Sequence, residues 1–164
     1  MAGELTSGEA STWRLIQRLS DLATGVVEHQ IRSAADLSSA EFDVLRCLVD
    51  VPDHQLRQNE LAALLGWDKS RLSHQLTRMQ HRELIDRQKS GRVHAVAVTR
   101  MGVQKFELAD NAHVAAVRSL LLEHLSVAER EALERTAAEA TASAEQSSGA
   151  PAPAVPRRLR PATS

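Results

Sequence analysis

Apolar residues return at helical spacing along most of this chain. Between residues 11 and 31 they recur every three to five positions, as on one face of an α-helix. The same period appears in residues 42–49, 61–65 and 72–79, and again from residue 103 to residue 121. The pattern therefore predicts a mainly helical protein in which each helix buries one face.

Residues that begin or end helices stand between these stretches. Residues 38–41 and 126–129 each offer the hydroxyl and carboxylate of a capping box, which satisfies the first amide groups of a helix. Pro52 ends the second helix because proline has no amide hydrogen, and Gly66 ends the third. Asp68 is then expected to cap a fourth helix, so that a tight turn joins the third and fourth.

Two segments near residue 90 have the pattern of strands. Residues 85–90 and 93–98 flank Gly91, and the alternation of the second favours a two-stranded hairpin with a short tip. Helix, helix, Gly-centred turn, helix and hairpin, in this order, are typical of a winged helix-turn-helix, whose second helix enters the major groove. The expected fold class is mainly α with a small β-hairpin wing.

Charge is unevenly distributed along the 164 residues, although the net charge is only −1. Residues 57–100 contain nine Lys and Arg against four Asp and Glu, a local charge of +5 that leaves −6 for the rest. A basic centre between acidic ends suggests a face that binds a polyanion. A solvated surface of mixed charge is the simpler explanation if charge alone is considered.

Composition excludes several classes of function. The chain has no apolar run long enough to span a membrane and no basic-then-apolar leader, so we expect a cytoplasmic protein. One cysteine, Cys47, excludes an intrachain disulfide and sites that need several thiolates. Four aromatic residues without tyrosine disfavour a stacking platform for single strands. Neither a nucleophile–base arrangement nor a phosphate loop is present, so we expect neither an enzyme nor a cofactor.

Three segments of the sequence are similar to one known protein family. "LSSAEFDVLRCLVD", "QNELAALLGWDKSRLSHQLTRMQHRELIDR" and "GRVHAVAVTRMG" resemble MarR-family transcriptional regulators, and the resemblance runs from about residue 10 to residue 142. It implies one domain over residues 1–144, with a winged helix-turn-helix at 38–99 between dimerisation helices at 10–34 and 100–144. Residues 145–164 are rich in Ser, Ala and Pro, which predicts a disordered tail.

The resemblance also implies how such a protein works. Members are homodimers that bind a near-palindromic duplex site, mostly as repressors, and many are released from DNA by a small-molecule effector. The residues give independent support for a dimer, because the apolar stripes of the terminal helices are too long for one small winged domain to cover. The alternative is that these helices fold back within one chain.

The outer face of the helix at residues 69–81 carries the first candidate DNA contacts. Arginine can donate two hydrogen bonds to guanine, glutamine can pair with adenine, and small polar or lysine side chains near a helix start can hold phosphates. Arg71 and Arg78 thus suit guanine, Gln75 suits adenine, and His74 suits either base or phosphate. The full set is Lys69, Ser70, Arg71, Ser73, His74, Gln75 and Arg78. The alternative for each is an ordinary solvated side chain.

The wing supplies a second set of expected contacts, Arg87, Lys89 and Arg92. Wings of the family usually carry Asp-x-Arg, in which the Asp orients an Arg that enters the minor groove. Here the corresponding residues are Ser90-Gly91-Arg92, on a shorter tip. Arg92 keeps the charge but lacks the carboxylate that orients the arginine of family wings for minor-groove contact.

Other polar residues are candidates for regulation. Cys47 lies in the second predicted helix, whereas the family's oxidation sensors usually keep their cysteine in the first, so we interpret it as a structural thiol. The acids and histidines Glu28, His29, Glu41 and His113 are expected to converge between the dimer helices and the winged domain, where the family binds ligands. No His-x-x-x-His pair supports a zinc site.

The sequence thus predicts a DNA-binding transcriptional regulator that acts as a homodimer, with double-stranded DNA and an unidentified effector as its partners. The main alternative is a winged-helix module that binds another protein and no DNA, because folds of this kind are reused. The basic segment at residues 57–100 argues against that alternative.

Overall fold

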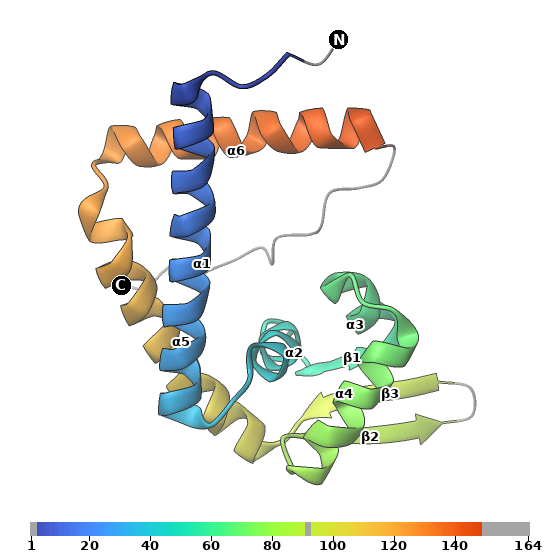
Figure 1. Ribbon diagram of the computed structural model, residues 1–164. Helices are drawn as coiled ribbons and strands as arrows, with labels where there is room; N and C mark the ends of the chain where they lie inside the picture. The colour runs from blue at the N-terminus through green and yellow to red at the C-terminus, as the bar shows by residue number, and fades with distance from the viewer. Residues whose placement is uncertain (1–2, 91–92, 149–164) are drawn as a thin grey trace.

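The structure is a computed structural model that describes residues 3–90 and 93–148. Its elements in chain order are α1 Ser7–Ala35, α2 Ser39–Val49, β1 Gln55–Arg57, α3 Gln58–Leu65, α4 Lys69–His81, β2 Ile85–Ser90, β3 Val93–Val98, α5 Arg100–Leu120, a short 3-10 helix η1 Leu122–His124, and α6 Val127–Ser148. In Figure 1, α1 and α5 run side by side, and the elements from α2 to β3 gather at one end of this pair. The expected fold class, mainly helical with a winged helix-turn-helix, is confirmed.

The sheet of the wing has three strands, whereas the sequence predicted two. Strand β3 lies in the centre and pairs antiparallel with β2 on one side and with β1 on the other. The pairing of β2 with β3 runs from Ile85 opposite Val98 to Ser90 opposite Val93. The third strand, β1, places Leu56 opposite Val96 and so ties the wing to the start of α3.

The hydrophobic core belongs to the winged domain. Side chains from α2, α3, α4 and the sheet are fully buried there, among them Leu45, Leu48, Leu61, Leu72, Leu76, Met79, Ile85 and Val96. The core continues towards the long helices, because the rings of Phe42 in α2 and Phe106 in α5 stack with centroids 5.4 Å apart. This stacking joins the winged domain to the α1–α5 pair.

Helix ends follow the capping pattern of the sequence, with one addition. Ser38 and Glu41 form the expected box: the Ser38 amide donates to the Glu41 carboxylate at 2.8 Å, and the Glu41 amide donates to the Ser38 hydroxyl. A further box of Thr6 and Glu9 begins α1 at Ser7, earlier than residue 11 where the apolar stripe begins. The long helix α1 ends where Asp36 adopts a left-handed conformation, with φ of 54°.

Helix α5 begins in close contact with the wing. A Cβ atom at Gly102 would lie 2.1 Å from the Leu84 carbonyl oxygen and 2.7 Å from a methyl carbon of Val98. Only a residue without a side chain therefore fits at this position. The Thr99 hydroxyl, which accepts from the Gly102 amide and donates to the Glu83 carbonyl, fixes the same junction.

Helix α6 extends further than the sequence predicted. It continues to Ser148, so residues 145–148 are helical where a disordered tail was expected, and the rest of that tail lies outside the described residues. The extension consists of Glu, Gln and Ser, which carry no apolar period to reveal a helix. Within the described ranges, α6 makes no extensive contact with another element. No described helix is long and apolar enough to cross a membrane.

Candidate nucleic-acid interface

Helix α4 presents one polar face to solvent and one apolar face to the core. Leu72, Leu76 and Met79 are fully buried, as predicted from their spacing. The residues that the sequence assigned to DNA and that lie exposed on the opposite face are Lys69, Ser70, Arg71, His74 and Arg78, while Ser73 is half-buried. The carboxylate of Asp68 caps this helix by accepting a hydrogen bond from the Arg71 amide at 2.8 Å.

Gln75 does not belong to the exposed face. Its side chain is only 4% exposed, because residue 75 falls between Leu72 and Met79 on the inner stripe of the helix. Its amide oxygen accepts a hydrogen bond from the Arg78 guanidinium. The interpretation of Gln75 as an adenine contact is therefore wrong for this structure, and Gln75 instead holds the guanidinium of Arg78.

The guanidinium of Arg71 packs against an aromatic ring. Its central carbon lies 4.3 Å from the centre of the Trp67 ring, in a cation–π contact. Trp67 is itself half-buried, and its ring packs against the hydrophobic core. The sequence analysis missed this pair, although a spacing of four residues between a tryptophan and an arginine around a helix start was a usable signal.

The wing residues fall into two groups. Arg87 is half-buried, and its guanidinium donates to the Gln58 amide oxygen at 3.2 Å and to the Thr77 hydroxyl at 3.4 Å. It therefore links β2 to α3 and α4, besides any contact with phosphate. Lys89 occupies the β2 position opposite His94. Arg92, the expected minor-groove residue, lies outside the described residues.

An ion-pair cluster holds α4 against the end of α1. The Arg82 guanidinium donates to both carboxylate oxygens of Glu41, at 2.8 and 2.9 Å, and to the Asp36 carboxylate at 2.6 Å. Glu41 is 5% exposed, and its carboxylate also caps α2, so this buried charge is fully partnered. Glu41 is thus occupied in joining three helices and does not line the expected ligand site.

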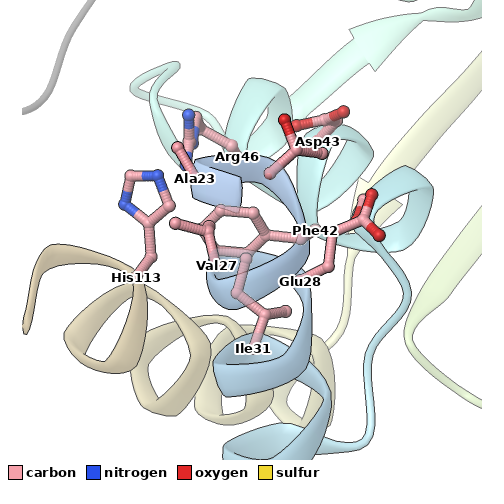
Figure 2. A pocket seen from close by; sticks show the side chains of 10 residues that line it. Ala23, Val27, Glu28, Ile31, Phe42, Asp43, Arg46 and His113 are labelled. Atoms are coloured by element: carbon pink, nitrogen blue, oxygen red, sulfur yellow. The ribbon is translucent and has the colours of Figure 1, made fainter. Parts of the chain in front are cut away.

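A cavity of about 420 Å³ lies between α1, α2 and α5. Figure 2 shows its lining: Ala23, Thr24, Val27, Glu28, Ile31, Ser39, Phe42, Asp43, Arg46 and His113. Of the four residues expected to converge here, Glu28 and His113 do so. His29 lines a separate, smaller hollow with Glu28 and Arg32.

Burial shifts the pKa of two groups that line the cavity, Asp43 and His113. Burial raises the pKa of Asp43, and the positive charges of Arg46 and Arg71 oppose that rise. Burial lowers the pKa of His113, helped by the charge of Arg46, so its imidazole is neutral near pH 7. The Nδ1 atom of His113 is buried and has no hydrogen-bond partner within the described chain.

Cys47 is a protonated thiol at the edge of the core. It is half-buried and packs against the core residues. Burial, with the charges of Asp43 and Asp50, raises its pKa to about 11. The reactive thiolate is therefore scarce at neutral pH, which supports a structural role. Among the described residues, no three His, Cys, Asp or Glu side chains are grouped so that they could hold a metal ion.

A family model described as "MarR family" matches residues 35–94, which span α2 to the start of β3. No curated protein sequence is significantly similar to the chain.

Several solved structures share the whole fold. AbsC, a MarR family transcriptional regulator from Streptomyces coelicolor, is 26% identical with a TM-score of 0.78, and the match covers 91% of this chain and 100% of AbsC. Sco3205, a MarR family regulator from the same organism in complex with DNA, is 24% identical with a TM-score of 0.80, covering 93% and 97%. A MarR variant from E. coli complexed with operator DNA is 20% identical with a TM-score of 0.68, covering 84% and 99%.

Proposed function

We propose that this chain, a MarR-family protein by its matched winged helix-turn-helix and its fold, is a sequence-specific regulator that binds double-stranded DNA. One observation carries the proposal: the exposed face of α4 is polar and basic, while its other face is locked into the core. A helix held in this way can enter the major groove without unfolding its domain. Sco3205 and the E. coli MarR variant are both described in complex with DNA. Because the family consists of transcriptional regulators, we propose no enzymatic activity.

We assign base recognition to two arginines of α4 and phosphate contacts to their neighbours. Arg71, which packs against Trp67, binds one guanine. Arg78 binds a second guanine through the guanidinium N–H groups that do not donate to Gln75. The phosphate set comprises Lys69, Ser70, Ser73 and His74 on α4 and Arg87, Lys89 and Arg92 on the wing.

We propose that the DNA-binding unit is a homodimer. The N-terminal half of α1 leaves large apolar side chains in solvent, with Leu15 64% and Ile16 55% exposed. Helix α6, which carries the exposed Val127 and Leu133, has no extensive contact within the described chain. A second copy would bury both surfaces and place two α4 helices on a near-palindromic site.

The cavity beside α1 suits a regulatory role. It touches both the long helices and α2, so an occupant would alter how the winged domain sits on the proposed dimer. We propose that the protein is a repressor and that a small-molecule effector in this cavity releases it from DNA.

Binding to a randomised library of DNA duplexes at several salt concentrations tests the proposal. Arg71→Ala should relax the preference at one base pair in each half-site, because a bidentate guanine contact contributes about 1–3 kcal/mol of discrimination. Arg92→Ala is the matched comparison: it should weaken all sequences alike and reduce the salt slope by about one to two units per dimer.

Two outcomes would contradict this assignment. If Arg92→Ala changes the central base preference while Arg71→Ala behaves as wild type, the wing and not α4 reads the sequence. If the wild-type protein shows no salt-dependent binding to any duplex, the chain is a winged-helix module for protein partners.

A further inference from the structure

One arginine side chain joins the ends of three helices. Arg82 is the C-cap residue of α4, Asp36 is the C-cap residue of α1, and Glu41 lies in the first turn of α2. The Nη1 atom of Arg82 donates to both carboxylate oxygens of Glu41. Its Nη2 atom donates to the carbonyl oxygen and the carboxylate of Asp36, each at 2.6 Å. We call these three residues the junction.

The hydrogen bonds of Arg82 leave its guanidinium little capacity to bind DNA. Both terminal nitrogens already have acceptors, and two carboxylates neutralise the positive charge. Arg82 also lies at the C-terminal end of α4, whereas Lys69 and Ser70 begin the exposed polar face at the other end. Arg82 thus adds to the positive charge of residues 57–100 in the sequence, but in the fold that charge is paired.

The part of α1 that Arg82 contacts is itself fixed to α5. The half-buried Lys105 of α5 donates to the Ala35 carbonyl at 2.7 Å, and the side chain of Ala35 is buried. Two cations at the C-terminal end of a helix also interact favourably with its dipole. The end of α1, which leads directly to α2 (Figure 1), is therefore a firm base for the junction.

The junction links α4 to the long helices. Helices α1 and α4 have no extensive contact elsewhere within the described ranges. The adjacent Glu83 is attached separately to the start of α5, because its carbonyl accepts a hydrogen bond from the Thr99 hydroxyl. If the junction were removed, the Thr99 contact and the core packing would remain. The orientation of α4 relative to α1 would then be less restricted.

We propose that Arg82 is a positioning residue for DNA recognition. It fixes the orientation of α4 relative to α1, and thereby the separation of the two half-sites that a dimer accepts. One extra base pair between half-sites moves one of them by about 3.4 Å and rotates it by about 35° around the duplex. A firm connection between α4 and α1 therefore makes binding sensitive to spacing. This inference rests on the proposed function, because the two α4 helices belong to two copies of the chain.

The first test compares operator spacings. It uses the duplex selected from the randomised library, two duplexes with one base pair more or less between the half-sites, and one duplex with a single half-site. The junction variant combines Glu41→Gln with Arg82→Gln, which leaves no unpaired buried charge and keeps a capping oxygen at residue 41. Wild type should prefer the selected spacing at least about tenfold, and the junction variant less than about threefold. Affinity for the single half-site should be unchanged.

A second variant separates positioning from simple charge effects. Asp36→Gly removes one partner of Arg82, keeps the Arg82–Glu41 pair and suits the left-handed conformation of this residue. It should weaken binding to the selected duplex about two- to threefold, because the contact to Arg82 is lost. Loss of a negative charge alone would strengthen binding to a polyanion. Asp53→Asn, an exposed position outside the junction, measures that charge effect and should leave the spacing preference as in wild type.

A measurement without DNA tests the same orientation independently. Spin labels at Gln80→Cys, an exposed position on α4, in a Cys47→Ser background report the distance between the two α4 helices of a dimer. The junction variant and Asp36→Gly should both broaden the distribution of this distance, whereas Asp53→Asn should not. Thermal melting of each variant verifies that the fold is intact.

Three results would overturn the inference. The first is a spacing preference and a distance distribution that are the same in wild type and in both junction variants. The second is a loss of affinity for the single half-site as large as that for the selected duplex, which would assign Arg82 to DNA contact or to the winged domain alone. The third is a monomeric wild-type protein, which would remove the dimer as well. A protein with the expected distance distributions that binds no duplex would instead contradict the proposed function.

Discussion

At the scale of single residues, Cys47 gives the stability of the protein a defined dependence on pH. Its pKa is about 11 in the folded chain against an ordinary value of 9.0, so the folded state holds the thiol proton more tightly. This contribution to stability is complete below about pH 9 and is lost as the pH rises towards 11. The free energy of unfolding should therefore fall more steeply over this range in wild type than in Cys47→Ser.

A second measurement tests whether the thiol of Cys47 is unreactive in the folded protein. Because the thiolate is scarce at pH 7.5, the folded protein should react with iodoacetamide more slowly than the urea-unfolded protein does. Mild peroxide should leave DNA complexes intact. A peroxide response that disappears in Cys47→Ser would instead identify an oxidation sensor.

Arg71 and Gln75 show which side-chain positions on α4 could be predicted from the sequence and which could not. Both side chains are polar, so polarity alone predicts that both are exposed. Only their angular positions around the helix axis distinguish the exposed residue from the buried one. Residue 75 stands three positions after Leu72 and four before Met79, which places it on the buried stripe. Polarity correctly predicted that Arg71 is exposed on α4. It wrongly predicted the same for Gln75, which is packed inside the fold.

At the scale of elements, Gly102 allows α5 to start against the wing. Gly102→Ala should destabilise the protein by about 1–3 kcal/mol, because the new methyl group would overlap the Leu84 carbonyl oxygen. Gly25→Ala in α1 is the matched control. No atom lies within 4 Å of the Cβ it would create, so it should stabilise the helix by up to about 1 kcal/mol. Urea unfolding measures both. Equal effects of the two substitutions would refute the close contact.

Elements differ in how well their own sequence reveals them. The long helices could be predicted because their apolar period repeats over many turns. Strand β1 could not, since Gln55–Arg57 has only three residues and forms only by pairing with β3, some forty positions later. The cavity was foreseen only in part for the same reason, because its lining combines α1 and α2 with His113 of α5, which is distant from them in sequence.

At the scale of the whole molecule, the exposed apolar face of α1 predicts the assembly state. Light scattering should give the wild-type protein twice the 17.9 kDa mass of one chain. Replacing Leu15 and Leu19 by Glu should give a monomer and weaken operator binding at least about a hundredfold, because two linked half-sites bind far more tightly than one. Gln17→Glu, an exposed polar site on the same helix, should change neither property.

The same light-scattering measurement can contradict the proposed dimer. A wild-type protein that is monomeric at micromolar concentration and still binds a palindrome tightly would need another explanation for the exposed faces of α1 and α6.

The length of α1 makes it a lever. With 29 residues at about 1.5 Å each, it is about 43 Å long, and the winged domain is attached at its C-terminal end. In the proposed dimer a partner chain would hold the N-terminal end of α1, so that a tilt of about 5° would displace the C-terminal end by about 4 Å. That is close to the rise of one base pair, about 3.4 Å. In the proposed dimer, a rotation of only a few degrees would thus shift one α4 helix by about one base step relative to the other.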